Sequence, residues 1–545
     1  MMFARFNRES KTIAGAALLI GVSSVLSRVL GLFRDRLLVA RFGVSDALDA
    51  YYASFQIPNF LFALLILGTL SVAFIPVFAE YLAKDEREDA WQMTNSILTI
   101  AGTVMGALCL LLSIGAAKLV PIVAPGFTGE KLAETISLTR VMMLSPFIFA
   151  LSAVLTSVLN AHKRFLAASL APLLYNASII FGVVVLSKPF GVVGVAYGAI
   201  LGALLHFLVQ VPAVVALGWR AHFVFDTKHP GVREVGRLFV PRIFGIDISQ
   251  LSQFIGTAIG TTFGVGAPAI FNLAMNIGAV PVGVVAIPFA MAAFPALSEA
   301  AARGDRASFR TTFSVTFRQI LFFLVPLTTM AFVLRFQIVR VLIGAKTLDW
   351  NDARLTAGAF ALAVLTLALQ GLAPLLARAF YALKNTWIPV VISAAAMTVN
   401  IAVTFALKSW FAETGGRTTA HLWLYLFGVD DVRVLALTAA FSVASFAQVA
   451  LLFFILRKKF GRLDGKAILR ATGKYVAGAV VAGYVAARII EPGLRSIDVR
   501  SLGSVFLEAS YASLLGLAAY LIVLALLKSE ELSAMIGMVR RKTGV

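Results

Sequence analysis

The sequence predicts an all-α membrane protein that crosses the bilayer many times. The chain has 545 residues, of which 60% are hydrophobic and only 14% are charged, and its mean hydropathy is +0.90. Soluble domains are about 45–50% apolar and about 25% charged, so this chain must bury its excess apolar surface in lipid. Its apolar residues occur in long runs between short polar connections, which is the pattern of membrane-spanning helices.

These runs predict fourteen spanning helices, because a helix that crosses the bilayer needs about 20 mostly apolar residues. The connections between them are loop-sized, so we expect no folded soluble domain. An even number of spans places both termini on one side of the membrane. The predicted spans are 12–36, 48–79, 92–117, 135–161, 166–187, 190–217, 236–263, 268–298, 313–336, 355–382, 387–409, 432–457, 470–490 and 503–528.

The basic residues set the orientation of the bundle. The formal net charge is +20, and in a soluble protein such a charge would suggest a nucleic-acid partner. Here most Lys and Arg lie in short connections, and more of them lie on the side of the two termini. The positive-inside rule makes that side cytoplasmic. We therefore expect cytoplasmic termini, contact with membrane lipids and no nucleic-acid partner.

Two segments of the first half recur in the second half in the same order. Ala73–Glu80 is echoed by Ala293–Glu299, and Asn160–Lys163 is echoed by Tyr381–Lys384. Transporters with internal repeats bind substrate between the repeats and rock one against the other. The predicted organisation is an N-terminal lobe of helices 1 to 6 (1–217), a C-terminal lobe of helices 7 to 12 (218–457), and helices 13 and 14 with a cytoplasmic tail (458–545).

Two cations, Arg28 and Arg34, lie near the end of the first predicted span. In an unbroken helix they would be about 9 Å apart along the axis, and Gly31 between them permits a bend. Each guanidinium can donate a forked pair of hydrogen bonds to a diphosphate or a carboxylate. Alternatively, both side chains extend to the lipid headgroups, as Arg near helix ends often does.

The second predicted span opens with Asp49 and carries two amides, Gln56 and Asn59, three residues apart. Asp49 can orient an Arg, sense a proton or cap the start of its own helix. The two amides can hydrogen-bond a sugar or a neighbouring helix. Asn272 and Asn276 form the equivalent pair in the eighth span, at a four-residue spacing.

An acid lies deep in the seventh span, where Asp247 has no basic neighbour in sequence. Such a group must be neutral, paired across helices or bound to a cation. Asn400 and Thr404, one turn apart in the eleventh span, offer oxygen ligands of the kind that Na⁺ accepts. A sodium site and a protonated, hydrogen-bonded Asp247 both stay open.

Two other polar groups lie within apolar spans. Arg378 in the tenth span is a further candidate cation, and His206 in the sixth span is expected to be a hydrogen-bonded core histidine. The sequence carries no Walker A motif, no H-E-x-x-H, no Cys/His metal spacing and no G-x-S-x-G. We therefore expect a transporter rather than an enzyme, driven by an ion gradient, the membrane potential or the gradient of its substrate.

Five motifs lie in the first third of the chain: S-R-V-L-G-x-x-R-D at 27–35, D-A-Y-Y-x-x-F-x-I-P-N at 49–59, A-F-I-P-V-F-A-E at 73–80, A-P-G-F at 124–127 and L-N-A-H-K-R-F at 159–165. Together they resemble the MurJ/MviN family of lipid II flippases, within the multidrug/oligosaccharidyl-lipid/polysaccharide exporter superfamily. The resemblance covers the chain from about residue 12 to the end of the fourteenth span and is strongest in the first third.

The resemblance implies two six-helix lobes around a cationic cavity, with two extra helices forming a groove for an undecaprenyl tail. It also implies alternating access that moves a diphosphate-linked headgroup to the outer leaflet of the bacterial inner membrane. By motif position, Arg28, Arg34 and Asp49 correspond to functional cavity residues of the family. The positions of the sodium site found in some members correspond to Asp247, Asn400 and Thr404.

The chain departs from the family at several charged positions. Many members have Arg where this chain has Phe62, Glu at Leu67, and Arg and Glu at Asn276 and Ala279. Only the first helix keeps its cations, so the headgroup clamp would be weaker or built differently, with Arg378 as a candidate replacement.

The predicted function is a monomeric lipid II flippase with no cofactor, apart from Na⁺ as a candidate coupling ion. In this interpretation Arg28, Arg34 and Arg378 bind the substrate, and Asp49, Asn59 and Asn276 shape its cavity. The alternatives are an exporter of another polyprenyl-linked glycan or of drugs on the same fold, a membrane-embedded glycosyltransferase, and a non-transporting scaffold. The missing cavity charges leave the identity of the lipid-linked substrate open.

Overall fold

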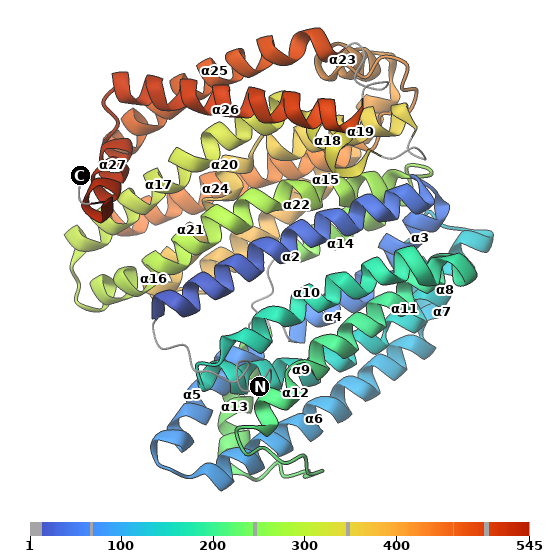
Figure 1. Cartoon of the computed structure of the whole chain (residues 1–545), viewed down its shortest axis with the longest axis vertical. Coiled ribbons are helices and arrows are strands. Elements are labelled where there is room, and N and C mark those ends of the chain that lie inside the picture. Colours follow the sequence, from blue (N-terminus) through green and yellow to red (C-terminus); the bar gives the residue numbers. More distant parts are fainter. Residues whose placement is uncertain are drawn as a thin grey trace. The chain divides into compact units, whose positions relative to one another are not determined.

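The computed structural model describes residues 13–65, 69–243, 248–344, 349–461, 463–494 and 501–543. The regular structure in these residues is helical throughout, without a strand. The predicted all-α class is therefore confirmed. Contacts within the chain define two compact units, residues 1–269 and 270–545 (Figure 1).

The first unit contains the helices drawn from blue to green in Figure 1. Within it α10 packs against α2 and α11, α9 packs against α5 and α6, and α3 packs against α8. The helices are α2 (Ile13–Phe42), α3 (Asp46–Ser54), α4 (Gln56–Leu65), α5 (Thr69–Ala83), α6 (Arg87–Ile114), α7 (Ala116–Val123), α8 (Gly129–Met142), α9 (Leu144–Ala161), α10 (Phe165–Phe181), the π-helix η1 (Gly182–Leu186), α11 (Ser187–Leu208), α12 (Val211–Val215), α13 (Pro230–Ile243) and α14 (Ile248–Gly260).

The helix α15 (Ala267–Pro281) begins in the first unit and continues into the second. In the second unit α25 packs against α26 and α17, and α22 packs against α24. Its helices are the π-helix η2 (Val282–Ala286), α16 (Ile287–Ala302), α17 (Arg306–Val333), α18 (Arg335–Ile343), α19 (Trp350–Val364), α20 (Leu367–Gln370), α21 (Ala373–Ala382), α22 (Trp387–Ala412), α23 (Thr414–Leu424), α24 (Leu435–Phe460), α25 (Gly465–Leu494), α26 (Leu502–Leu526) and α27 (Glu530–Thr543).

In the described part of the chain, nine helical segments are long and apolar enough to cross a membrane, or ten if the bent pair 350–364 and 367–382 counts as one span. One of the nine, Phe165–Val215, has 51 residues. At a rise of 1.5 Å per residue it is more than twice as long as the hydrocarbon core is thick, and it breaks at Gly191, whose φ of 56° is not helical. It therefore contains the fifth and sixth predicted spans. The second and seventh predicted spans include residues outside the described ranges, so the count of fourteen stays a prediction.

Glycines let α10 and α11 approach each other closely. A Cβ atom on Gly198 would lie 2.7 Å from the Cα of Gly182, which is closer than real Cβ contacts allow. Gly194 and Gly202, one turn away on either side of Gly198, also lie against the backbone of the neighbouring segment. Small residues at four-residue spacing are a common way for membrane helices to pack backbone against backbone. This contact fixes α10, which forms part of the candidate site.

The echoed segments end their helices in the same way in both units. Lys163 and Lys384 have left-handed backbones, with φ of 57° and 55°. The amide of each donates to the carbonyl three residues earlier, and the next amide donates to the carbonyl five residues before it. This is a Schellman turn. The helices that carry the other echoed pair, 73–80 and 293–299, end in the same way at Asp85 and Gly304. The match supports the predicted repeat, while the lobe boundaries at 217 and 457 stay predictions.

Candidate functional site

A buried carboxylate, Asp49, ties several segments of the first unit together. Asp49 is fully buried, and its Oδ2 atom accepts hydrogen bonds from Lys131 Nζ at 2.8 Å and from the Gly266 amide at 2.7 Å. Its Oδ1 atom accepts from the Ala269 amide at 3.0 Å. The two amides belong to the start of α15, where the first amides of a helix lack partners within the helix. Asp49 therefore caps α15.

This arrangement excludes one of the roles that the sequence left open for Asp49, the cap of its own helix. The cap of its own helix α3 is Ser45, whose Oγ accepts from the Leu48 amide. The basic partner of Asp49 is Lys131 on α8, at the edge of the site, where it also pairs with the half-exposed Asp46 at 2.6 Å. The resulting cluster of Asp49, Lys131, Gly266 and Ala269 is called the Asp49 node below.

The A-P-G-F motif reinforces the same end of the unit. The Gly126 amide donates to Thr261 Oγ1 at 3.1 Å. A Cβ atom on Gly126 would collide with the backbone of Thr261, so only glycine permits this approach. The turn after α7 is thereby held against the end of α14. In the predicted topology, this end of the unit faces outwards.

Arg34 is held by partners within the protein. Its Nε and Nη2 atoms donate to Asp35 Oδ1 at 2.9 and 2.8 Å, and its Nη1 atom donates to Asn176 Oδ1 at 3.2 Å. Asn176 on α10 in turn donates to Ser27 Oγ at 3.2 Å. The charge of Arg34 is therefore compensated by Asp35, which is 3% exposed, and the side chain links α2 to α10.

Arg28 lies in different surroundings, in a cavity of about 400 Å³ between α2, α9 and α10. Among the described residues no hydrogen bond or ion pair holds its guanidinium, and the cavity lining carries no acid. Hydroxyl and amide groups supply the rest of its polar surface. A guanidinium beside hydroxyls and an amide suits an anion that also carries hydrogen-bonding groups. The lining residues are Ile20, Ser23, Ser24, Ser27, Arg28, Thr156, Asn160, Phe165, Ala168, Ser169 and Pro172.

A polar network supports the wall of this cavity. Thr156 Oγ1 donates to Gln210 Oε1 at 2.7 Å, and Gln210 Nε2 donates to Ser152 Oγ at 2.7 Å. The Ser152 hydroxyl lies 2.7 Å from His206 Nδ1. His206 is thus confirmed as a hydrogen-bonded histidine, and it belongs to a chain of side chains that ends at the cavity.

The predicted amide pair of the second span does not act as one group. Gln56 is buried, and its Nε2 atom donates to the Tyr52 carbonyl at 3.0 Å. Asn59 is exposed on α4. Phe62 packs against Phe149, with ring centroids 5.1 Å apart. An apolar contact therefore occupies the position for which the family resemblance implies a cation.

The remaining predicted residues belong to the second unit or lie outside the described residues. Asn276 on α15 and Arg378 on α21 are partly buried. Asn400 and Thr404 on α22 are buried, and Thr404 Oγ1 donates to the Asn400 carbonyl at 2.8 Å. Their participation in one site with the residues of the first unit stays a prediction. Ala279 is exposed on α15. Asp247 and Leu67 lie outside the described residues.

Sequence reasoning missed several residues of the site. Lys131 gave no signal, because it lies in a polar connection 82 residues from Asp49. Asn176 lies 142 residues from Arg34, so no local pattern linked the two. Asp35 is the direct neighbour of Arg34, and this adjacency could have indicated that the two charges compensate each other.

The family model and the curated relatives agree on one family. The family model described as "Lipid II flippase MurJ" matches residues 38–502. A "Lipid II flippase MurJ" of Burkholderia cenocepacia is 27% identical over 393 residues, which cover 71% of this chain and 76% of the relative. A "Probable lipid II flippase MurJ" of Buchnera aphidicola is 26% identical over 484 residues, covering 84% and 94% of the two chains.

Solved structures share the fold at low identity. "Lipid II flippase MurJ, inward closed conformation" has a TM-score of 0.73 and 21% identity, covering 94% of this chain and 98% of the other. An inward-facing transporter of the multidrug resistance MATE family has a TM-score of 0.62 and 15% identity, covering 81% and 95%. The family match extends over most of the chain, from the last third of α2 to the start of α26. The chain therefore belongs to the lipid II flippase MurJ family.

Proposed function

We propose that this chain is a lipid II flippase, which carries the diphosphate-linked peptidoglycan precursor from the inner to the outer leaflet. The family membership supports this function, as do the names of the curated relatives. The single observation in the site that carries it is the state of Arg28. This cation lies in a cavity lined by hydroxyl and amide groups and makes no bond to the described part of the protein.

Arg28 binds the diphosphate in this proposal, because a guanidinium that no carboxylate occupies can direct its forked donors at phosphate oxygens. Ser23, Ser24 and Asn160 line the same cavity and can bond to sugar or phosphate oxygens. Arg34 has a supporting role, because Asp35 and Asn176 already take its donors. It positions α2 against α10, and Arg28 lies on that stretch of α2.

The Asp49 node acts as the outer closure of the first unit. One ion pair and two amide hydrogen bonds converge on a single buried carboxylate. Opening this end requires that these bonds break together, since each leaves a buried charged or polar group behind. Alternating access then needs a compensating event, for which binding of the substrate anion elsewhere in the unit is the candidate.

The remaining parts of the proposal rest on the sequence. The chain lies in the bacterial cytoplasmic membrane with both termini inside, acts as a monomer and performs no catalysis. The cations of its transport path include Arg378, with Asn59 and Asn276 as polar neighbours. A coupling Na⁺ would be held by Asp247, Asn400 and Thr404. For this site, measuring transport with and without Na⁺ in an Asp247→Asn variant is the test, and unchanged sodium dependence would exclude it.

Complementation tests the main proposal. Cells depleted of their own lipid II flippase are supplied with the intact chain, with Arg28→Ala or with the control Arg87→Ala, whose arginine is exposed at the start of α6. We expect rescue by the intact chain and by the control, and no rescue by Arg28→Ala at equal membrane abundance. Rescue by all three would refute the role of Arg28. Failure of the intact chain at good expression would instead indicate another lipid-linked substrate.

A further inference from the structure

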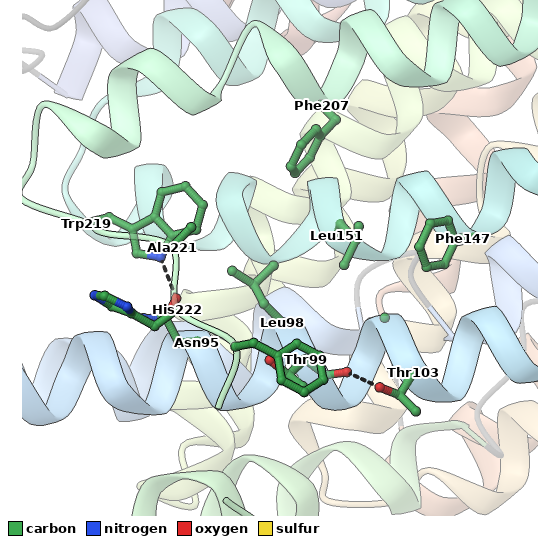
Figure 2. Close-up of a pocket in the computed structure, with 12 residues that line it drawn as sticks. Asn95, Leu98, Thr99, Thr103, Phe147, Leu151, Phe207, Trp219, Ala221 and His222 are labelled. Carbon is green, nitrogen blue, oxygen red and sulfur yellow. Dashed lines mark hydrogen bonds between the residues drawn. The ribbon is translucent and has the colours of Figure 1, made fainter. Parts of the chain in front are cut away.

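A second cavity of the first unit lies on its periphery, away from Arg28. It has a volume of about 480 Å³ and lies between α6, α9, the end of α11 and the segment 219–223 (Figure 2). Trp219 and His222 lie at one end of the cavity, and Phe147 and Thr103 lie at the other (Figure 2). The lining is mostly apolar, with its few polar groups on α6 and at His222. It includes Asn95, Leu98, Thr99, Gly102, Thr103, Phe147, Leu151, Phe207, Trp219, Ala221, His222 and Phe223.

The protein builds the wall of this cavity through specific hydrogen bonds. Trp219 Nε1 donates to Asn95 Oδ1 at 2.8 Å, and Asn95 Nδ2 donates to the Arg220 carbonyl at 3.0 Å. The Val224 amide donates to Thr99 Oγ1 at 3.3 Å. Asn95 and Thr99 are one turn apart on α6, so the segment between Trp219 and Val224 is fastened along one face of that helix. The segment thereby closes one side of the cavity.

The position on α6 indicates which environment the cavity meets. Only 17% of the most apolar stretch of α6 is buried by the rest of the protein, so the helix faces lipid. Asn95 and Thr103 lie about 5 and about 16 Å inside the predicted span that begins at 92, at 1.5 Å per residue. One half of the hydrocarbon core is about 15 Å thick. The cavity therefore extends through the depth of a single leaflet.

We propose that this cavity binds an anionic phospholipid of the cytoplasmic leaflet, with one acyl chain between α6 and α9 and the phosphate at the segment 219–228. The apolar lining between Leu98 and Phe147 matches an acyl chain, and its volume is in the range of ligand sites. In the segment 219–228, Arg220 and Lys228 outnumber Asp226, and this favours a negative headgroup beside it.

Two neighbouring positions on α6 provide a matched test. Thr103 lines the cavity, whereas Val104 is 55% exposed on the lipid-facing surface and does not line it. The intact protein, Thr103→Phe and Val104→Phe are purified and washed in detergent, and retained phosphatidylglycerol is counted per chain by mass spectrometry. We expect the intact protein and Val104→Phe to retain about one molecule more than Thr103→Phe. Equal retention by all three would overturn the site.

A fluorescence measurement tests the position of the chain. Trp219 lines the headgroup end of the cavity and is 7% exposed, so bromines on the first carbons of a bound acyl chain lie closer to it than those of bulk lipid. A variant that keeps Trp219 and has Phe at the other five tryptophans is placed in vesicles of phosphatidylglycerol brominated on its chains. We expect Trp219 to be quenched, and quenched less when phosphatidylcholine carries the bromines. Equal quenching by both lipids would refute the selection for anionic lipid, and absent quenching would refute occupancy.

Discussion

Replacing Asp49 by Asn should loosen the start of α15. The asparagine oxygen can accept from one of the two amides, but its NH₂ group then faces the other amide as a second donor. The substitution also removes the ion pair with Lys131. Removing one partner of a buried pair costs about 3–5 kcal/mol. Lys131 is 15% exposed and keeps Asp46 as a partner, so we expect a smaller loss than this range, about 2–3 kcal/mol.

Hydrogen–deuterium exchange in lipid nanodiscs measures this loss directly. The reporters are the amides of Gly266 and Ala269, because both donate to Asp49. At 1.36 kcal/mol for each factor of ten, a loss of about 2–3 kcal/mol accelerates their exchange about 30- to 150-fold. The same variant should fail to rescue cells depleted of their own lipid II flippase, because the loss destabilises the closed outer end relative to the open state.

Asp46→Asn is the matched control, because it changes the other carboxylate on the same lysine. The Asp46 side chain is 57% exposed, and pairs at such positions contribute about 0–1 kcal/mol. We expect its exchange at Gly266 and Ala269 to change by less than about fivefold. Equal acceleration in the two variants would refute the argument that burial of Asp49 holds the start of α15.

Two further predictions concern the first unit. Arg34→Ala should lower the midpoint of thermal unfolding in detergent more than Arg28→Ala does. Arg34 bonds to the buried Asp35 at 2.8 Å, and a hydrogen bond to a charged group is worth about 1.5–3 kcal/mol. Equal midpoints would contradict the supporting role of Arg34. Gly198→Ala should destabilise the protein more than Gly106→Ala. The added carbon meets backbone at 2.7 Å in the first variant and a Phe ring at 3.5 Å in the second. The midpoints of thermal unfolding of the two variants test this prediction.

Much of the architecture followed from local patterns in the sequence. Hydropathy is a property of single residues and their neighbours, so the apolar runs predicted the helical membrane class without knowledge of any contact. The ends of the helices were also local, since the turns at Lys163 and Lys384 each use amides and carbonyls within five residues. The break at Gly191 falls beside the boundary predicted between the fifth and sixth spans.

The charged residues of the site could be identified from the sequence, but the groups that bond to them could not. Arg28 and Arg34 carry the same group on the same helix, so local patterns offered no reason to separate them. In the folded unit Asp35 and Asn176 hold Arg34, whereas Arg28 faces a cavity. The difference depends on how α10 packs against α2, which Gly182 of η1 and the glycines of α11 help to fix.

Local patterns in the sequence were enough to predict the class of the protein, its family motifs and the residues able to bind an anion. Which of these residues are available for a ligand, and which hold the fold, depends on how the helices pack. Asp49 meets Lys131 and Gly266 across 82 and 217 residues of chain. A helix forms from interactions within a few residues, but the partner of a buried charge is set by the packing of helices that are distant in sequence.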